Sequence, residues 1–327
     1  MTIQVPPVGF VSAGTLEEAA RLVSDPAERA VLIAGGTDLV PKLKRRQTAP
    51  ITLVSLADIE AMHGIAITDD GSCVIGALTT LAEIADSSDV PPVLATAAST
   101  VASPQIRNSA TIGGNLCVDT RCNYIDMPLT WRQARGHCLK DGGDTCWVAP
   151  ASNRCWAISS TDLAPVAIAL NATVRLVSSR GERVVPAEVL YRSDGIDYLT
   201  KTPDEILVDI TIPAHTTRNS FQKLRRRGSI DFALLSVACA VDLDTEGTCT
   251  SARIVVGGIA SAPVSATDAE TFLAGKQLTP EVIEEASEIA SKPVRAQDNT
   301  DTGQRYRKWM ISVHVAKALN EAAAERA

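Results

Sequence analysis

Five of the eight cysteines in this chain lie between Gly113 and Trp156, together with three of its four tryptophans. A large globular chain gains nothing by crowding isolated thiols into one polar segment, so the crowding indicates that something binds them together. The fold therefore has to bring several thiols to one place, around a metal ion, an iron–sulfur cluster or disulfide bonds. The five residues are Cys117, Cys122, Cys138, Cys146 and Cys155.

Length and composition argue against disulfide bonds as the reason for this crowding. A chain of 327 residues with 45% apolar content can bury an ample core without crosslinks, and its length predicts two or three domains. Residues 1–10 lack the pattern of a signal peptide, and no apolar run is long enough to span a bilayer. We expect a cytoplasmic protein without a membrane span, whose reduced thiols serve metal binding or redox chemistry.

The charge balance argues against a nucleic-acid partner. The chain has 31 basic and 38 acidic residues, a net charge of −7 and an isoelectric point near 5.2. Its aromatic content of 4% also leaves few side chains on which bases could stack.

Hydrophobic periodicity predicts a mixed α and β first half and an α+β C-terminal part. Thr15 followed by Glu18 has the pattern of a capping box at the start of a helix. Helices are expected at residues 15–22, 81–87, 93–101, 162–169, 279–291 and 306–324. Strands are expected at residues 30–34, 51–56, 72–77, 172–177, 181–185, 205–212, 232–242 and 252–259. The polar segment 213–219 is expected to be a linker.

Two glycine-rich turns, at residues 34–38 and 110–115, have the composition of anion-binding loops. Paired glycines permit positive φ, so that successive backbone N–H groups can turn toward a phosphate. Thr37, Thr111 and Asn115 add side-chain donors. Neither turn has the Rossmann or Walker spacing, and a single Gly-Gly pair after a strand is in roughly two of three cases an ordinary tight turn. Together the two turns suggest a dinucleotide held at its diphosphate.

Five phrases in the chain, in this order, resemble the FAD-binding medium subunits of the molybdenum hydroxylases, the xanthine dehydrogenase and carbon monoxide dehydrogenase family. The resemblance implies an α+β protein with a two-part FAD-binding domain of the vanillyl-alcohol-oxidase (PCMH) type and a C-terminal α+β domain like that of the CO dehydrogenase flavoprotein. It divides the chain into FAD-binding subdomains at 1–56 and 57–215 and a C-terminal domain at 216–327. The phrases are residues 33–39, 106–116, 160–165, 221–226 and 254–260.

The resemblance also implies which residues contact FAD. The first turn would wrap the diphosphate and the second would close over it. Asp162 would contact the flavin nucleotide from the start of a helix, and Lys223 would lie near the ring system as a cationic partner. Without the family, Asp162 is equally a carboxylate at a helix N-terminus, and Lys223 a solvated basic strand end. The implied set is Leu32, Ile33, Ala34, Gly35, Gly36, Thr37, Asp38, Leu39, Ala102, Thr111, Gly113, Gly114, Asn115, Asn123, Asp162 and Lys223.

The cysteine segment, residues 117–157, departs from ordinary members of the family, which run almost directly from the second turn to residue 160. The last four of its cysteines are separated by 15, 7 and 8 residues, whereas structural zinc sites use C-x2-4-C pairs, so zinc is disfavoured though not excluded. Four thiolates converging from any direction can hold a cubane cluster. The insertion resembles the branch formed by the β subunits of 4-hydroxybenzoyl-CoA reductases, which implies a 4Fe-4S cluster on Cys122, Cys138, Cys146 and Cys155.

The rest of the insertion admits two interpretations. Cys117 is the spare cysteine, more simply explained as a small buried hydrophobe behind the second turn. The basic residues near the ligands would compensate a negatively charged cluster, or simply keep a loop soluble. Its three tryptophans would shield the cluster or form a small core. The basic residues are Arg121, Arg132, Arg135, Lys140 and Arg154, and the tryptophans are Trp131, Trp147 and Trp156.

We find no nucleophile–base constellation, no molybdopterin-binding part and no plant-type ferredoxin domain, so no catalytic residue is predicted. The chain is interpreted as an electron-transfer subunit with FAD and 4Fe-4S. The resemblance implies partners, a molybdopterin-binding large subunit and a 2Fe-2S small subunit in a dimerised heterotrimer, with ferredoxin or another electron carrier. The implied reaction is reductive dehydroxylation of an aromatic acyl-CoA. The alternatives are a hydroxylase or dehydrogenase acting on an aromatic or heterocyclic substrate, and a stand-alone flavin oxidoreductase with a zinc-bound docking lobe.

Overall fold

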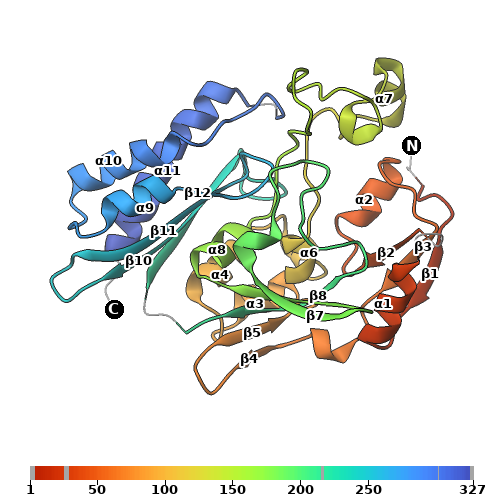
Figure 1. The fold of residues 1–327 in the computed structure, drawn as a ribbon, viewed down its shortest axis with the longest axis horizontal. Coiled ribbons are helices and arrows are strands. Elements are labelled where there is room, and N and C mark those ends of the chain that lie inside the picture. The colour runs from red at the N-terminus through yellow and green to blue at the C-terminus, as the bar shows by residue number, and fades with distance from the viewer. Residues whose placement is uncertain (1–3, 26–28, 215–216, 301, 325–327) are drawn as a thin grey trace.

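The computed structural model describes residues 4–25, 29–214, 217–300 and 302–324, which build three successive sheets and a lobe of mostly irregular chain (Figure 1). Each sheet lies within one of the three segments expected from the sequence. We retain the boundaries 1–56, 57–215 and 216–327 as a proposal. Part of the expected linker, residues 215–216, lies outside the described residues, and from Arg218 onward this segment is a strand.

The N-terminal sheet is parallel, with strand order β1-β3-β2. Helix α1 connects the first two strands, and Thr15 caps it by accepting a hydrogen bond from the Glu18 amide at 3.1 Å. The Glu18 carboxylate accepts from the Gly14 amide at 2.9 Å, one residue before the position that a capping box uses. The elements are β1 (Gly9–Ser12), α1 (Leu16–Ser24), β2 (Ala30–Ile33), α2 (Leu39–Lys44) and β3 (Thr52–Ser55).

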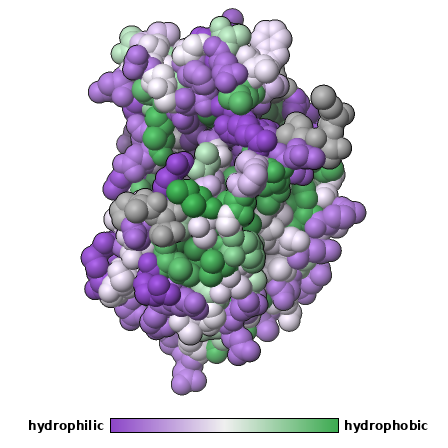
Figure 2. All heavy atoms as spheres, turned by 90° about the vertical axis from the view of Figure 1, so that its right-hand side faces the viewer, coloured by the Kyte–Doolittle hydropathy of each residue, from purple (hydrophilic) through white to green (hydrophobic). Residues whose placement is uncertain are grey.

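Apolar side chains of edge strand β1 and of the residue before β3 are exposed. Phe10 is 64% exposed, Ile51 49% and Val11 38%. Figure 2 looks onto this side of the molecule and shows apolar side chains gathered below a polar upper lobe.

The middle sheet is antiparallel, with strand order β4-β5-β8-β6-β7. Its strands are β4 (Ile65–Ile67), β5 (Cys73–Gly76), β6 (Thr173–Ser178), β7 (Gly181–Pro186) and β8 (Ile206–Ile212). Its helices are α3 (Leu81–Asp86), α4 (Pro92–Ser99), α5 (Pro104–Arg107), α6 (Ile112–Leu116) and α8 (Leu163–Ala169), with 3-10 turns at Glu60–Met62 and Ala187–Leu190. All seven residues of α8 are buried, because this helix lies between the C-terminal sheet and helices α4 and α6.

The C-terminal sheet is antiparallel in the order β12-β11-β10-β9, and side chains on its strands alternate between two cores. Val237 and Cys239 face its own helices, whereas Ala238 and Ala240 join the core around α8. The expected strand at 232–242 begins only at Leu235. The elements are β9 (Arg218–Leu224), β10 (Leu235–Leu243), β11 (Cys249–Gly257), β12 (Val264–Ser265), α9 (Thr267–Leu273), α10 (Pro280–Ser291) and α11 (Gln304–Ala324).

The cysteine insertion forms the lobe above α2 in Figure 1 and contains α7 (Leu129–Arg135) and a 3-10 turn at Leu139–Asp141. Arg132 attaches it to the rest of the molecule: its buried guanidinium pairs with Asp141 and donates to the carbonyls of Arg45 at 2.7 Å and Arg46 at 3.1 Å, at the end of α2. Among the described residues, the helices are too short or too polar to cross a lipid bilayer.

Candidate functional site

The two glycine turns lie against each other although about 70 residues of chain separate them. The first turn runs from the end of β2 to Asp38 at the start of α2, with Gly36 at φ +69°. A Cβ on Gly35 would stand 1.6 Å from the carbonyl oxygen of Ser109, so only glycine allows this contact. The structure thus joins the two turns that the sequence analysis paired.

The second turn is organised by the N-terminus of α6. Thr111 caps this helix by accepting a hydrogen bond from the Gly114 amide at 3.1 Å. Gly113 packs closely against Ala77, so that a Cβ added to Gly113 would lie 2.7 Å from the Cβ of Ala77. Gly114 is exposed, and the one atom near its added Cβ is Thr111 Oγ1 at 3.1 Å. The Asn115 amide oxygen accepts from Thr161 Oγ1 at 2.8 Å. The hydroxyl of Thr111 and the oxygen of Asn115 therefore already have structural partners.

Asp162 and Lys223 form a buried ion pair beside this turn. Their side chains are 4% and 3% exposed, and Lys223 Nζ lies 2.7 Å from Asp162 Oδ2. Lys223 also donates to the Thr100 carbonyl at 3.1 Å. The alternative interpretation of Lys223 as a solvated strand end is wrong, because the antiparallel register carries it under the α4–α5 turn. Asp162 occupies the N-cap position of α8 but makes no capping hydrogen bond.

The second carboxylate oxygen of Asp162, Oδ1, is buried and has no hydrogen-bond partner among the residues that the structure describes. Burial raises the pKa of Asp162, while the neighbouring ammonium of Lys223 lowers it. An orphaned buried acceptor beside two glycine turns is suited to a ligand that brings its own hydrogen-bond donors. This residue set therefore fits the nucleotide of FAD.

Ala102 lies in the turn between α4 and α5, which contacts the segment that follows β9. It has φ +43°, and its carbonyl accepts from the Ile230 amide at 2.8 Å and from Ser229 Oγ at 3.1 Å. Arg225 donates to the Thr100 carbonyl at 3.0 Å, so the chain after β9 wraps this turn.

Phe232, which the sequence analysis placed inside a strand, lies in this wrapping segment and is 49% exposed. The guanidinium of Arg121 stacks over its ring at 4.0 Å and pairs with Asp38 of the first turn. The contact between Arg121 and Phe232 could not be predicted from the sequence, since the two residues are far apart along the chain. Asn123, in contrast, is exposed in the lobe, and its amide donates to the Asn299 carbonyl at 3.1 Å.

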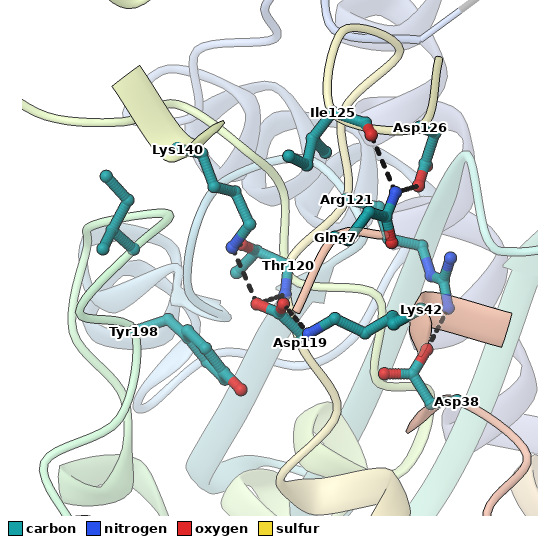
Figure 3. Close-up of a pocket in the computed structure, with 11 residues that line it drawn as sticks. Asp38, Lys42, Gln47, Asp119, Thr120, Arg121, Ile125, Asp126, Lys140 and Tyr198 are labelled. Carbon is teal, nitrogen blue, oxygen red and sulfur yellow. Dashed lines mark hydrogen bonds and ion pairs between the residues drawn. The ribbon is translucent and has the colours of Figure 1, made fainter. Parts of the chain in front are cut away.

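A network of charged side chains connects α2 to the lobe (Figure 3). Asp119 accepts from Lys140 Nζ at 2.7 Å and pairs with Lys42 of α2. Burial by itself raises the pKa of Asp119, but the ammonium groups of Lys140 and Lys42 leave it below its ordinary value. Asp119 is therefore an ionised link between the helix that follows the first turn and the lobe.

Four cysteines of the lobe line one pocket, and they are the four predicted as ligands. Their exposed fractions are between 4% and 8%, whereas Cys117 lies outside the pocket at the end of α6. Burial raises the pKa of Cys122 to about 12 and that of Cys155 to about 11, so these thiols stay protonated unless a metal replaces the proton. The remaining lining residues are Tyr124, Ile125, Leu139, Lys140, Trp147, Val148 and Ala157.

In the part of the chain that the structure describes, no group of three or more His, Cys, Asp or Glu side chains is arranged to hold a single metal ion. A tetrahedral zinc site would bring its sulfurs to about 3.8 Å of one another, since each Zn–S bond is about 2.3 Å. An iron–sulfur cluster keeps its thiolates farther apart, because inorganic atoms fill the space between them. Four buried thiols that line one pocket are a donor set that such a cluster can use.

The basic and aromatic side chains of the lobe differ in whether they line this pocket. Of the five basic residues, Lys140 alone lines the pocket. Trp147 also lines it and meets Tyr124 edge to face at 5.4 Å. Trp131 is 63% exposed, so the expectation that it would shield the pocket or pack in a small core is wrong for this residue. It stands on the outer face of α7, whose inner face is occupied by Arg132.

Two family models match the chain in succession. Residues 6–215 match the FAD binding domain in molybdopterin dehydrogenase, and residues 219–322 match the CO dehydrogenase flavoprotein C-terminal domain. The chain belongs to this FAD-binding subunit family. The expected family and fold class are thereby confirmed, an FAD-binding domain followed by a C-terminal domain of the CO dehydrogenase flavoprotein type. The chain is thus the flavoprotein subunit of a molybdenum hydroxylase-family oxidoreductase.

Similar proteins span nearly the same length. The 6-hydroxypseudooxynicotine dehydrogenase complex subunit alpha of Paenarthrobacter nicotinovorans is 29% identical, covering 97% of this chain and 95% of the relative. The xanthine dehydrogenase FAD-binding subunit of Escherichia coli O157:H7 is 27% identical, covering 95% and 94%. A chain in the structure of carbon monoxide dehydrogenase from Hydrogenophaga pseudoflava superposes with a TM-score of 0.82, at 26% identity, covering 99% and 100%.

Proposed function

We propose that this FAD-binding subunit also carries a 4Fe-4S cluster on Cys122, Cys138, Cys146 and Cys155, and transfers electrons within a reductase like 4-hydroxybenzoyl-CoA reductase. The observation that carries the proposal is the single pocket formed by these four buried cysteines inside an insertion. When bound, the cluster would supply a one-electron entry point and FAD would exchange one or two electrons.

The residues of the two turns have separate tasks in this proposal. Backbone groups of residues 32–39 and 111–115 would hold the FAD diphosphate, and Gly114 leaves an open side for its approach. Asp162, paired with Lys223, would accept a hydrogen bond from the nucleotide at its second carboxylate oxygen. Ala102 would lie against the same ligand, and Asn123 would be its contact from the lobe.

Substrate chemistry would take place on a partner. We propose a cytoplasmic heterotrimer with a molybdopterin-binding large subunit and a 2Fe-2S small subunit, two copies of which associate, and ferredoxin or another carrier as the electron source. The apolar side chains gathered on the face shown in Figure 2 support the presence of partner chains, since a large exposed apolar surface is typical of an interface. The proposed reaction is reductive removal of a hydroxyl from an aromatic acyl-CoA.

A second candidate is an oxidising enzyme of the same architecture, in which electrons leave through the cluster. The names of similar proteins favour it: a nicotine 6-hydroxylase medium subunit is 27% identical over 98% of this chain, and two others are dehydrogenase subunits. The two candidates differ in the direction of electron flow. Anaerobic mixing with reduced ferredoxin, compared with mixing with a candidate substrate of the complex, distinguishes them by which one bleaches the flavin.

The cluster is tested by iron, acid-labile sulfide and zinc analysis of anaerobically purified chain, with FAD measured alongside. About four iron and four sulfide per chain are expected. Cys146→Ala should lower both, whereas Cys249→Ala, a buried cysteine in the C-terminal sheet, serves as the matched control and should change neither. One zinc and no iron per chain would instead support a docking lobe, and the absence of both metals would refute the proposal.

A further inference from the structure

We propose that Gly195, outside the insertion, is a positioning residue for the cysteine ligands, and that the loop at residues 191–199 sets their arrangement. This inference rests on the proposed cluster. The loop is part of the FAD-binding domain by sequence but contacts the lobe at Cys155. None of its residues belongs to the predicted ligand set.

The base of the loop is attached to the helix that bears the second glycine turn. Tyr191 and Leu199 form an antiparallel bridge. The Tyr191 hydroxyl donates to the Leu116 carbonyl at 2.9 Å, and the Tyr198 hydroxyl donates to the Cys117 carbonyl at 3.3 Å. These contacts fix the loop to the C-terminal end of α6, on the flavin side of the molecule.

The tip of the loop binds three segments of the insertion through a single residue. The Gly195 amide donates to the Cys155 carbonyl at 2.9 Å. The Gly195 carbonyl accepts from Lys140 Nζ at 2.5 Å and from the hydroxyl of Thr120. Thr120 stands two residues before Cys122, and Lys140 two residues after Cys138. One residue thus holds the segments of three of the four ligands.

A side chain at position 195 has no room. A Cβ there would lie 2.7 Å from Cys155 Sγ, 2.7 Å from the Ala157 amide nitrogen and 2.8 Å from Ala157 Cβ. That amide donates to Cys155 Sγ at 3.4 Å. Since Gly195 does not have a positive φ, close approach to the sulfur and not backbone conformation requires glycine here.

The turn is also held internally, so the tip is presented in a defined position. Asp194 accepts from the amides of Ile196 at 2.7 Å and Asp197 at 3.2 Å. Arg154, next to Cys155, donates to Ser193 Oγ at 2.7 Å. Hydrogen bonds of this kind around ligands orient them, and losing one typically weakens metal binding 10- to 100-fold.

The test compares Gly195→Ala with Gly14→Ala in the full-length chain purified anaerobically. Gly14 precedes α1, and the nearest atom to its added Cβ is 3.9 Å away. We expect Gly195→Ala to lose most of its iron and sulfide while keeping the FAD content of the wild type, and Gly14→Ala to keep both. A second variant, Thr120→Val, adds no bulk and removes both the donor to Gly195 and the acceptor for Lys140, which itself bonds Gly195; it should release iron to a chelator about ten-fold faster than the wild type.

The iron-release rate and the electron paramagnetic resonance spectrum of the reduced cluster are measured on every variant that retains iron. An altered spectrum in Thr120→Val supports positioning of the ligands. If Gly195→Ala does not fold, the rate of iron release from Thr120→Val by itself tests whether the loop positions the ligands. Wild-type iron content in Gly195→Ala, or a wild-type release rate in Thr120→Val, would overturn the inference. Wild-type protein without iron would refute the proposed function, which is a different result.

Discussion

Removing the ammonium of Lys223 should destabilise this protein in a strongly pH-dependent way. Lys223→Met leaves Asp162 buried, with the hydrogen-bond partner of Oδ2 removed and Oδ1 already unpartnered. Breaking one side of a buried ion pair typically costs about 3–5 kcal/mol. The carboxyl can instead take up a proton, which at pH 7 costs about 4 kcal/mol for a group with an ordinary pKa near 3.9. Both routes predict a loss of about 4 kcal/mol at pH 7.

The sign of the pH dependence follows from the same carboxyl. Burial raises the pKa of Asp162, and without Lys223 the one remaining group that lowers it is Arg225, whose effect is smaller. A carboxyl whose pKa is raised in the folded state favours folding below its unfolded pKa, and this contribution is lost as pH rises toward the folded pKa. At pH 5 the proton costs only about 1.5 kcal/mol. The deficit of the variant should therefore shrink between pH 7 and pH 5.

The measurement is thermal unfolding of the flavin-free chain, followed by far-ultraviolet circular dichroism at both pH values. A loss of about 4 kcal/mol corresponds to a melting temperature lower by roughly 10 °C in a chain of this size. Asp162→Asn combined with Lys223→Met should recover part of the loss, because no charge is then buried. The matched control is Arg180→Met, whose partner is Asp204 and whose side chain is 65% exposed, and it should cost under about 1 kcal/mol.

The reasoning would be refuted if Lys223→Met melted within 2 °C of the Arg180→Met control at pH 7. An equal deficit at pH 7 and pH 5 would also contradict it, since the loss would then not come from the charge of Asp162.

Three other substitutions have distinct expected outcomes. Gly114→Val should abolish FAD retention without unfolding the chain, because Gly114 is exposed and the one atom that crowds an added Cβ is Thr111 Oγ1, at 3.1 Å; a variant with full flavin absorbance would contradict the assignment. Arg132→Met should cost about 3–5 kcal/mol locally and raise amide hydrogen exchange in residues 117–157, with α10 as the unaffected reference. Cys117→Ala should keep both iron and FAD, since this thiol lies outside the pocket, and loss of iron would make it a ligand.

Much of the flavin site could be predicted because its signals are local. Paired glycines with adjacent threonine and asparagine residues restrict the backbone within five or six positions, and the structure places both turns where strands or turns end against a helix. The interpretation of Lys223 as solvated failed for the opposite reason. Its burial depends on the register of β9 against β10 and on Thr100, which no nearby residue indicates.

The four cysteines predicted as ligands lie around one pocket, whose lining does not include Cys117, and their role as ligands stays a prediction. The residues that hold their segments were not predicted. Gly195 stands in a polar loop and belongs to none of the sequence motifs. It holds the segments of the cysteines through hydrogen bonds to residues 40 to 75 positions away. Phe232 was misplaced in a strand, because a run of apolar residues does not show where pairing begins.

By itself, the sequence determined the family, the positions of the backbone turns and the set of thiols, since these depend on residue type and short spacing. Tertiary structure alone decided that Asp162 meets Lys223, that α2 is tied to the lobe through Asp119, and that one glycine closes over Cys155. The physical reason is that burial and hydrogen bonding depend on which distant segments the chain brings into contact, and local patterns do not encode that choice.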